Sequence, residues 1–222
     1  MKLTIEPRLS SSWRLAVFIP VFSLAAALFS GGVFLYFMGV SPFQAYRAIL
    51  TASLGDAYGL SETVVKAIPL TMTGIAVMLS FTMLIWNIGA EGQIFVGAIA
   101  ATAVVRFFYT DSRPVMLIMM FLAAGAAGGI WAAIAGFMRA KWSVNEIITT
   151  LMLNYIAMNL LNYFVFGPWR DPSSLGFPMT PPFPDTARLS VFWGTRIHGG
   201  LILAIILPLL FWFVLKFTRW GY

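Results

Sequence analysis

Six long apolar runs constrain the fold of this chain more than any other feature. They cover residues 14–38, 64–86, 92–109, 114–138, 147–167 and 199–217. Each run approaches or exceeds the roughly 20 residues that an α-helix needs to cross the hydrocarbon core of a bilayer. Backbone polar groups find no water in lipid, so a span is a helix or part of a closed barrel, and runs of this length favour helices. The sequence predicts an all-α, polytopic transmembrane helical bundle of about six spans, in one domain over residues 1–222.

The composition agrees with a lipid surrounding. Hydrophobic residues make up 60% of the chain and charged residues 10%, whereas soluble domains carry about 25% charged residues. The net charge is +6, but the Lys and Arg residues flank the apolar runs and do not form a basic stripe. Membrane lipid is therefore an expected partner, and nucleic acid is not.

Several kinds of site are not expected from the residues present. The chain has no Cys and one His, His198, so we predict no metal site. It has no phosphate-binding GxxxxGK[ST] loop and no HExxH or GxSxG motif, so we predict neither a cofactor nor an enzymatic activity of its own. The first apolar run is longer than the 7–15 residues of a signal-peptide core, so it is predicted to be a retained span.

Lys and Arg are densest at one set of span ends. They cluster before the first run, after the fourth and at the end of the sixth: Lys2, Arg8, Arg14, Arg139, Lys141, Lys216 and Arg219. This density predicts a cytoplasmic N-terminus. Two long segments, 39–63 and 168–198, are then external loops. The second contains six prolines, which exclude a continuous helix and leave a turn-rich cap, a docking loop or a plain connector as interpretations.

A polar stretch interrupts the apolar pattern between the second and third runs. It reads Asn87-Ile-Gly-Ala-Glu-Gly-Gln93 and predicts an interrupted helix near 87–93. A carboxylate at membrane depth pairs with another group or faces water, so Glu91 is a functional candidate. From the residues alone, an ordinary loop at the inner surface is an equally good interpretation.

Other residues have a structural interpretation. Ser143 and Glu146 have the spacing of a capping box at the start of the fifth run, and Asn145 lies between them. Gly125 and Gly129 in the fourth run have the GxxxG spacing that lets helix backbones approach closely. We predict a capping or packing role for these five residues.

The fifth run also carries a polar stripe. Asn154, Tyr155, Asn159 and Asn162 fall within an arc of about 140° on a helix. A polar stripe on a membrane helix faces the interior of the bundle. It either joins helices through hydrogen bonds or lines a pathway, and the residues alone leave both possibilities open.

Three segments resemble one family of membrane proteins. They are Asn87 to Gln93 followed by Gly97-Ala98, Val144 to Ala157, and Thr218 to Tyr222. They resemble the permeases of ATP-binding-cassette importers for nucleosides and simple sugars, within the branched-chain amino acid and ribose permease family. In that family, a motif like the third leads into a cytoplasmic segment that contacts the ATPase and then into further spans. The resemblance thus implies the N-terminal portion of a longer permease.

The resemblance implies import of a small polar solute, a nucleoside or simple sugar, by alternating access across a bacterial plasma (inner) membrane. The implied partners are cytoplasmic ATPase subunits, a second permease subunit and an extracytoplasmic solute-binding protein. The expected pathway residues are Asn87, Glu91 and Gln93 on the interrupted helix, with Asn154, Tyr155 and Asn159 opposite. Amides and phenols suit hydroxylated solutes because they both donate and accept hydrogen bonds. The alternative is an ion-coupled secondary transporter or channel with Glu91 as the coupling carboxylate.

Overall fold

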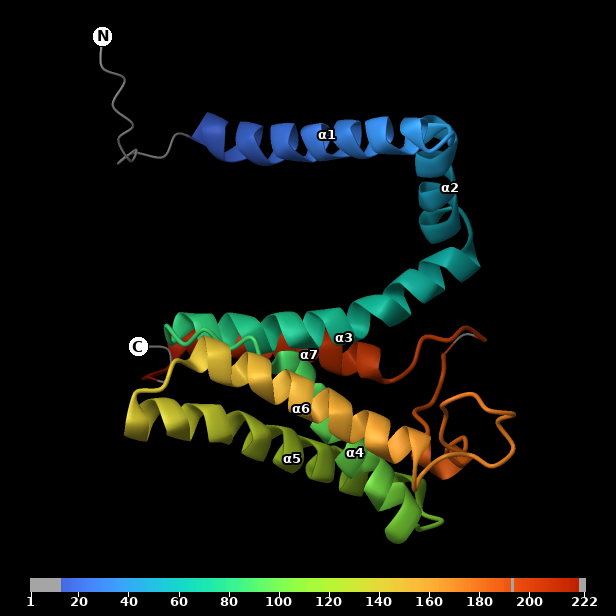
Figure 1. Cartoon of the computed structure of the whole chain (residues 1–222), viewed down its shortest axis with the longest axis vertical. Helices are drawn as coiled ribbons and strands as arrows, with labels where there is room; N and C mark the ends of the chain where they lie inside the picture. Colours follow the sequence, from blue (N-terminus) through green and yellow to red (C-terminus); the bar gives the residue numbers. More distant parts are fainter. Residues whose placement is uncertain (1–12, 193, 220–222) are drawn as a thin grey trace. The chain divides into compact units, whose positions relative to one another are not determined.

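The computed structural model describes residues 13–192 and 194–219, which form helices joined by turns (Figure 1). The helices are α1 Trp13–Phe37, α2 Pro42–Leu54, α3 Ala57–Thr82, α4 Ala90–Phe107, α5 Arg113–Trp142, α6 Glu146–Phe166, the 3-10 helix η1 Asp185–Ala187, and α7 Gly200–Phe217. Six of them are long and apolar enough to cross a membrane, and these are all except α2 and η1. The prediction of an all-helical bundle with about six spans is confirmed.

The chain divides into two compact units, Met1–Thr63 and Val64–Tyr222. In the first unit α2 packs against α1, and the Tyr46 hydroxyl donates a hydrogen bond to the Leu28 carbonyl at 2.6 Å. A Cβ at Gly31 would lie 3.0 Å from that hydroxyl, so the glycine makes room for the contact. Most of segment 39–63 is helical, because it contains α2 and the first residues of α3. Helix α3 begins before the apolar run at 64, where the Asp56 carboxylate accepts a hydrogen bond from the Gly59 N–H at 2.6 Å and caps the helix.

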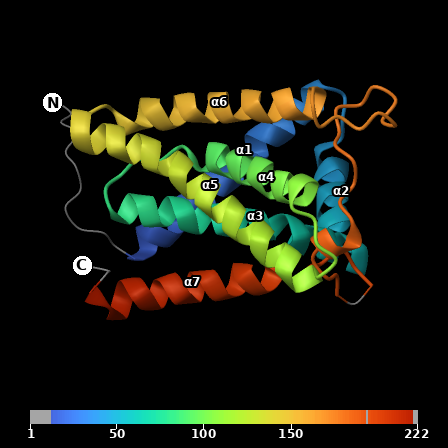
Figure 2. The ribbon, with the colours of Figure 1, turned by 90° about the horizontal axis from the view of Figure 1, so that it is seen from below.

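In the second unit α4 packs against both α5 and α6, and α5 runs diagonally beside α4 (Figure 2). Two glycines make the α4–α5 approach close. A Cβ at Gly97 would lie 3.2 Å from the Ala124 carbonyl oxygen, and a Cβ at Gly128 would lie 3.2 Å from the Gln93 carbonyl oxygen. The two helices thus touch backbone to backbone at these points.

The predicted packing pair Gly125 and Gly129 does not make this contact. No described atom lies within 4 Å of a Cβ built at either position, and both residues are exposed. The GxxxG spacing identified α5 as a helix with a small-residue face, but the side of α5 that meets α4 is one residue along, at Ala124 and Gly128. The prediction was wrong for contacts within the described chain.

Residues 168–198 form a turn-rich segment that connects α6 to α7 and lies against the start of α5. The Arg113 guanidinium donates to the Arg188 carbonyl from Nε at 3.1 Å and Nη2 at 2.7 Å. Ala187 of η1 is buried with Val104 and Met116. These contacts fix the middle of the segment on α4 and α5.

The loop 171–179 within this segment is closed on itself. The Asp171 N–H donates to the Met179 carbonyl at 2.9 Å. The Ser173 hydroxyl at 2.7 Å and the Ser173 N–H at 2.9 Å donate to the Asp171 carboxylate, and these bonds lower the pKa of Asp171. The loop exposes Leu175 and Phe177, with exposed fractions of 95% and 71%.

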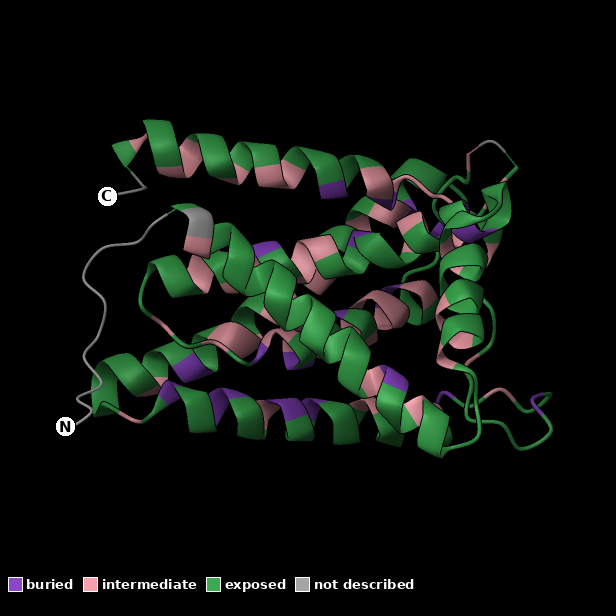
Figure 3. Cartoon of the chain, turned by 90° about the horizontal axis from the view of Figure 1, so that it is seen from above, coloured by how far each residue is buried: buried purple, intermediate pink, exposed green. Residues whose placement is uncertain are grey.

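Most apolar side chains of the spans remain exposed in the described chain (Figure 3). Phe29 on α1 is 75% exposed, and Phe121 on α5 is 64% exposed. Soluble monomers rarely expose contiguous apolar surface of this extent. Lipid or other apolar protein segments are needed to cover it, as in a membrane protein.

We expect Gly128→Leu to lower the melting temperature of the purified protein and Gly129→Leu to leave it unchanged or raise it. A side chain at 128 collides with the Gln93 backbone, and overpacking of this kind costs about 1–3 kcal/mol. Position 129 is open, and replacing a helical Gly there gains up to about 1 kcal/mol of helix propensity. Thermal unfolding in detergent measures the difference, and equal shifts in both variants would contradict the assigned α4–α5 contact.

Candidate functional site

The connection between α3 and α4 runs along α6 instead of lying at the end of the bundle (Figure 2). Side chains spaced four residues apart on one face of α6 accept hydrogen bonds from backbone N–H groups of this connection and of the first turn of α4. The bonds are Trp86 N–H to Glu146 Oε1 (3.4 Å), Ile88 N–H to Thr150 Oγ1 (3.3 Å) and Gly92 N–H to Asn154 Oδ1 (2.8 Å). We call these three bonds the α6 ladder.

The ladder places the start of α4 inside the bundle. Asn154 lies eight residues beyond the first residue of α6, a distance of about 12 Å along the helix. Residues 83–89 are not helical. Non-helical backbone at membrane depth is tolerated only where protein buries it or where it lines a cavity. In the structure the break lies at 83–89, between two separate candidate spans, and Glu91 and Gln93 fall in the first turn of α4. The depth of this break in a membrane stays a prediction.

Asn154 supplies from α6 the cap that α4 lacks. The N-cap residue of α4 is Gly89, which has no side chain to accept a hydrogen bond. Asn154 Oδ1 accepts from the Gly92 N–H, and Asn154 Nδ2 donates to the Ile88 carbonyl at 2.9 Å. The side chain is buried, and both of its polar atoms are engaged. A Cβ at Gly92 would lie 2.7 Å from Asn154 Oδ1, so the bond requires glycine there.

Asn87 and Gln93 contact each other across the break. Asn87 Oδ1 accepts from the Gly89 N–H at 2.8 Å and from Gln93 Nε2 at 3.5 Å. Both side chains are half-buried. Two of the predicted pathway residues therefore lie together, and their bonds hold the turn that leads into α4.

Glu91 is exposed in the first turn of α4. No ion pair joins it to any residue in the described ranges. A carboxylate at a helix N-terminus is favoured by the helix dipole, and an exposed one is available to bind a solute. Within residues 13–192 and 194–219, no group of three His, Cys, Asp or Glu side chains could hold a metal ion.

Tyr155 and Asn159 lie on a different side of α6 from Asn154. Successive residues turn by about 100°, so the two side chains point about 100° and 140° away from Asn154. Both are exposed, and Asn159 Nδ2 donates to the Tyr155 carbonyl of its own helix at 2.8 Å. The hydrogen bonds of the described chain do not connect either residue to the break. The predicted set opposite Glu91 is thus divided between two faces of α6.

The predicted capping box at the α5–α6 turn was wrong. Helix α5 continues to Trp142, and Ser143 is its C-cap in a left-handed conformation, with φ +52°. Asn145 is the N-cap of α6, and its Oδ1 accepts from the Ile147 and Ile148 N–H groups. Glu146 is therefore the first helical residue instead of the third. Its carboxylate binds the Arg139 guanidinium and the Trp86 N–H.

The sequence interpretation missed Thr150. Its hydroxyl is buried, accepts from the Ile88 N–H and donates to the Glu146 carbonyl at 2.7 Å. The signal was present in the spacing, because Glu146, Thr150 and Asn154 recur every four residues and share one helix face. In a span, a threonine among apolar residues is a weaker indication of a polar contact than an asparagine or a carboxylate.

We expect Asn154→Ala to destabilise the protein by about 1–3 kcal/mol, because it leaves the buried Gly92 N–H and the part-buried Ile88 carbonyl without this partner. Asn154→Asp keeps an acceptor for the Gly92 N–H and should recover part of the loss. Asn159→Ala is the matched control, since its amide bonds only to its own helix. Thermal unfolding in detergent measures the three variants. Equal stability of Asn154→Ala and Asn159→Ala would contradict the capping role.

Comparison with known proteins gives consistent matches. The chain is 37% identical over its whole length to the glucose ABC transporter permease protein TsgB13 of Haloferax volcanii, of which it covers 61%. It is 29% identical over 92% of its length to the guanosine ABC transporter permease protein NupP of Bacillus subtilis, of which it covers 59%. It is 23% identical over 93% of its length to the nucleoside ABC transporter permease protein NupB of Lactococcus lactis, again covering 59%.

The chain spans about three fifths of the length of these relatives. No solved structure is significantly similar to it. Residues 59–222 match the family described as branched-chain amino acid transport system / permease component, and this region contains the α6 ladder and the break before α4. The chain therefore belongs to the branched-chain amino acid transport system permease family.

Proposed function

We propose that this chain is part of a permease subunit that imports a small polar solute, a nucleoside or simple sugar, at the expense of ATP. The family match over 59–222 supports the permease role. Relatives named for glucose, guanosine and nucleoside transport support the solute class. The subunit does not hydrolyse ATP itself in this proposal, and that activity belongs to separate partner subunits.

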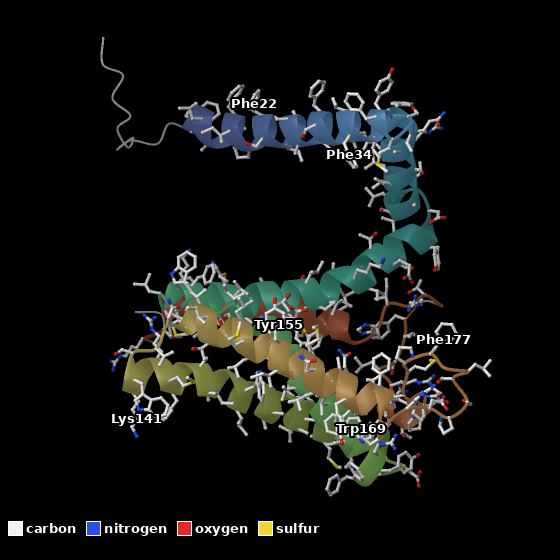
Figure 4. All side chains as sticks on the ribbon, in the orientation of Figure 1. Phe22, Phe34, Lys141, Tyr155, Trp169 and Phe177 are labelled. Atoms are coloured by element: carbon white, nitrogen blue, oxygen red, sulfur yellow. The ribbon has the colours of Figure 1, made fainter. Side chains whose placement is uncertain are left out.

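The proposed assembly contains cytoplasmic ATPase subunits, a second permease subunit and an extracytoplasmic solute-binding protein. The subunit is a multi-pass protein of the bacterial plasma membrane, with its N-terminus and the α5–α6 turn on the cytoplasmic side. Segment 168–198 is then external. Its closed loop carries the exposed side chains of Leu175 and Phe177, of which Phe177 is labelled in Figure 4. We assign to this loop the contact with the solute-binding protein.

The break before α4 is the observation that carries the proposed pathway. Interrupted helices at membrane depth are characteristic of transporter binding sites, where loosened backbone faces a cavity. Glu91 lies at this break with an exposed carboxylate. An ionisable residue within a span indicates a functional site, and a carboxylate accepts hydrogen bonds from the hydroxyl groups of a sugar or ribose.

The six pathway candidates have different roles in this proposal. Glu91, Tyr155 and Asn159 are exposed and contact the solute as the pathway opens and closes. Asn87 and Gln93 shape the turn into α4 through their mutual hydrogen bond. Asn154 positions the start of α4 and does not contact the solute, because both of its amide atoms are occupied.

We expect Glu91→Gln to lower the kcat/KM of solute uptake by tenfold or more. A hydrogen bond to a charged group contributes about 1.5–3 kcal/mol, and each 1.4 kcal/mol is about tenfold. The measurement is uptake by proteoliposomes that contain the full-length permease, its ATPase and its solute-binding protein. Asp111→Asn removes an exposed carboxylate from the α4–α5 turn and is the matched control.

The same proteoliposomes separate the two candidate mechanisms. Uptake that needs ATP and is insensitive to an imposed proton or sodium gradient agrees with the importer. Uptake that follows the gradient without ATP would replace it with the ion-coupled transporter. Unchanged uptake in Glu91→Gln, with ATP dependence intact, would keep the importer and remove Glu91 from its pathway.

A further inference from the structure

A lysine lies against two aromatic rings at the end of α5. Lys141 Nζ is 5.4 Å from the centroid of the Phe137 ring and 5.9 Å from that of the Trp142 ring. The two rings meet edge to face, with centroids 5.5 Å apart and an interplanar angle of 81°. All three side chains are exposed.

The end of α7 repeats this arrangement. Lys216 Nζ is 5.1 Å from the centroid of the Trp212 ring and 5.5 Å from that of the Phe217 ring. The rings are again edge to face, with centroids 5.5 Å apart and an interplanar angle of 82°. In both clusters one ring precedes the lysine by four residues and the other follows it directly.

Both clusters lie at the same end of the second unit, where α5 and α7 finish (Figure 1; Lys141 is labelled in Figure 4). The density of Lys and Arg predicts this end to be cytoplasmic. Aromatic rings and long basic side chains at the end of a span lie at the depth of the lipid headgroups, with the ammonium group toward water. The clusters are thus at the level of the phosphates of one leaflet.

Each lysine keeps its hydrogen-bond donors available. Neither Lys141 nor Lys216 forms an ion pair with a described residue. The nearby carboxylate of Glu146 binds Arg139 instead. A ring attracts the ammonium charge through its π face, while the N–H groups that point away from the ring can donate to an anionic oxygen.

The α7 cluster also borders an apolar groove between α3 and α7. The groove has a volume of about 460 Å³, and Lys216 lies on its rim. Its walls include Gly74, Ile75 and Met78 from α3 and Pro208, Trp212 and Leu215 from α7. No described atom lies within 4 Å of a Cβ built at Gly74. An apolar groove with an ammonium group at its headgroup end matches the two parts of a phospholipid, an acyl chain and a phosphate.

We propose that the two lysine–aromatic clusters bind the headgroups of anionic phospholipids, and that at α7 an acyl chain of the bound lipid lies in the α3–α7 groove. The rings hold each ammonium group at a fixed depth, so that both sites act on the same leaflet. This inference concerns the lipid contact of the chain and is independent of the transported solute.

The test is native mass spectrometry of the full-length permease in detergent, titrated with phosphatidylglycerol or phosphatidylcholine. We expect selective binding of phosphatidylglycerol, weakened about fivefold by Lys216→Gln and by Lys141→Gln. Lys66→Gln removes an exposed lysine of α3 that is in neither cluster, and it should bind as the unmodified protein does. Lys216→Arg keeps the charge and should retain binding, which separates charge loss from misfolding.

Two further arms identify the occupant. Gly74→Phe fills the groove without changing any charge and should weaken binding in the α7 site while leaving the Lys141 site unchanged. Glycerol phosphate, which has the headgroup chemistry without acyl chains, should not displace the lipid. Equal binding of phosphatidylcholine, equal losses in Lys66→Gln, or full displacement by glycerol phosphate would overturn the proposal. So would cross-linking that finds a protein helix in the groove of the full-length permease.

Discussion

The backbone N–H groups at the start of α4 are the constraint on which the second unit depends. They lead into a candidate membrane span, and inside a span no water is available to accept such hydrogen bonds. Helix α6 provides the acceptors through Glu146, Thr150 and Asn154. Because these side chains recur every four residues, one face of a regular helix can satisfy an irregular segment that runs beside it. The position of Glu91 in the first turn of α4, with an exposed side chain, follows from this arrangement.

Glycines are the second requirement for a central α4. Gly92 allows Asn154 to reach the helix start, and Gly97 and Gly128 allow α4 and α5 to touch backbone to backbone. A larger side chain at any of these positions would meet atoms at 3.2 Å or closer. The polar ladder on one side of α4 and the glycine contacts on the other fix the same helix between two neighbours, so its first turn has little freedom to move alone.

Polar residues in the spans differ in whether their partners are already present. Asn154 and Glu146 are buried and bonded within the chain, so their role is structural. Glu91 and Tyr155 are exposed, so a partner can come from outside the described chain. The same distinction applies at the α5–α6 turn. Arg139 forms an ion pair with Glu146, whereas Lys141 lies against two aromatic rings. Residue type alone does not separate these roles.

The apolar runs were sufficient to predict the number of spans and their approximate positions, because crossing a bilayer requires a continuous apolar helix. The motifs at residues 87–98 and 144–157 were likewise sufficient to indicate the family. The periodicity of a sequence, however, describes each helix by itself and does not say which neighbour a given face meets. The contacts between helices therefore decided that Gly128 and not Gly125 faces α4, and that Asn154 and Tyr155 point to different surroundings. They also decided which stretch of α6 the break before α4 lies against, because α6 side chains accept its backbone hydrogen bonds.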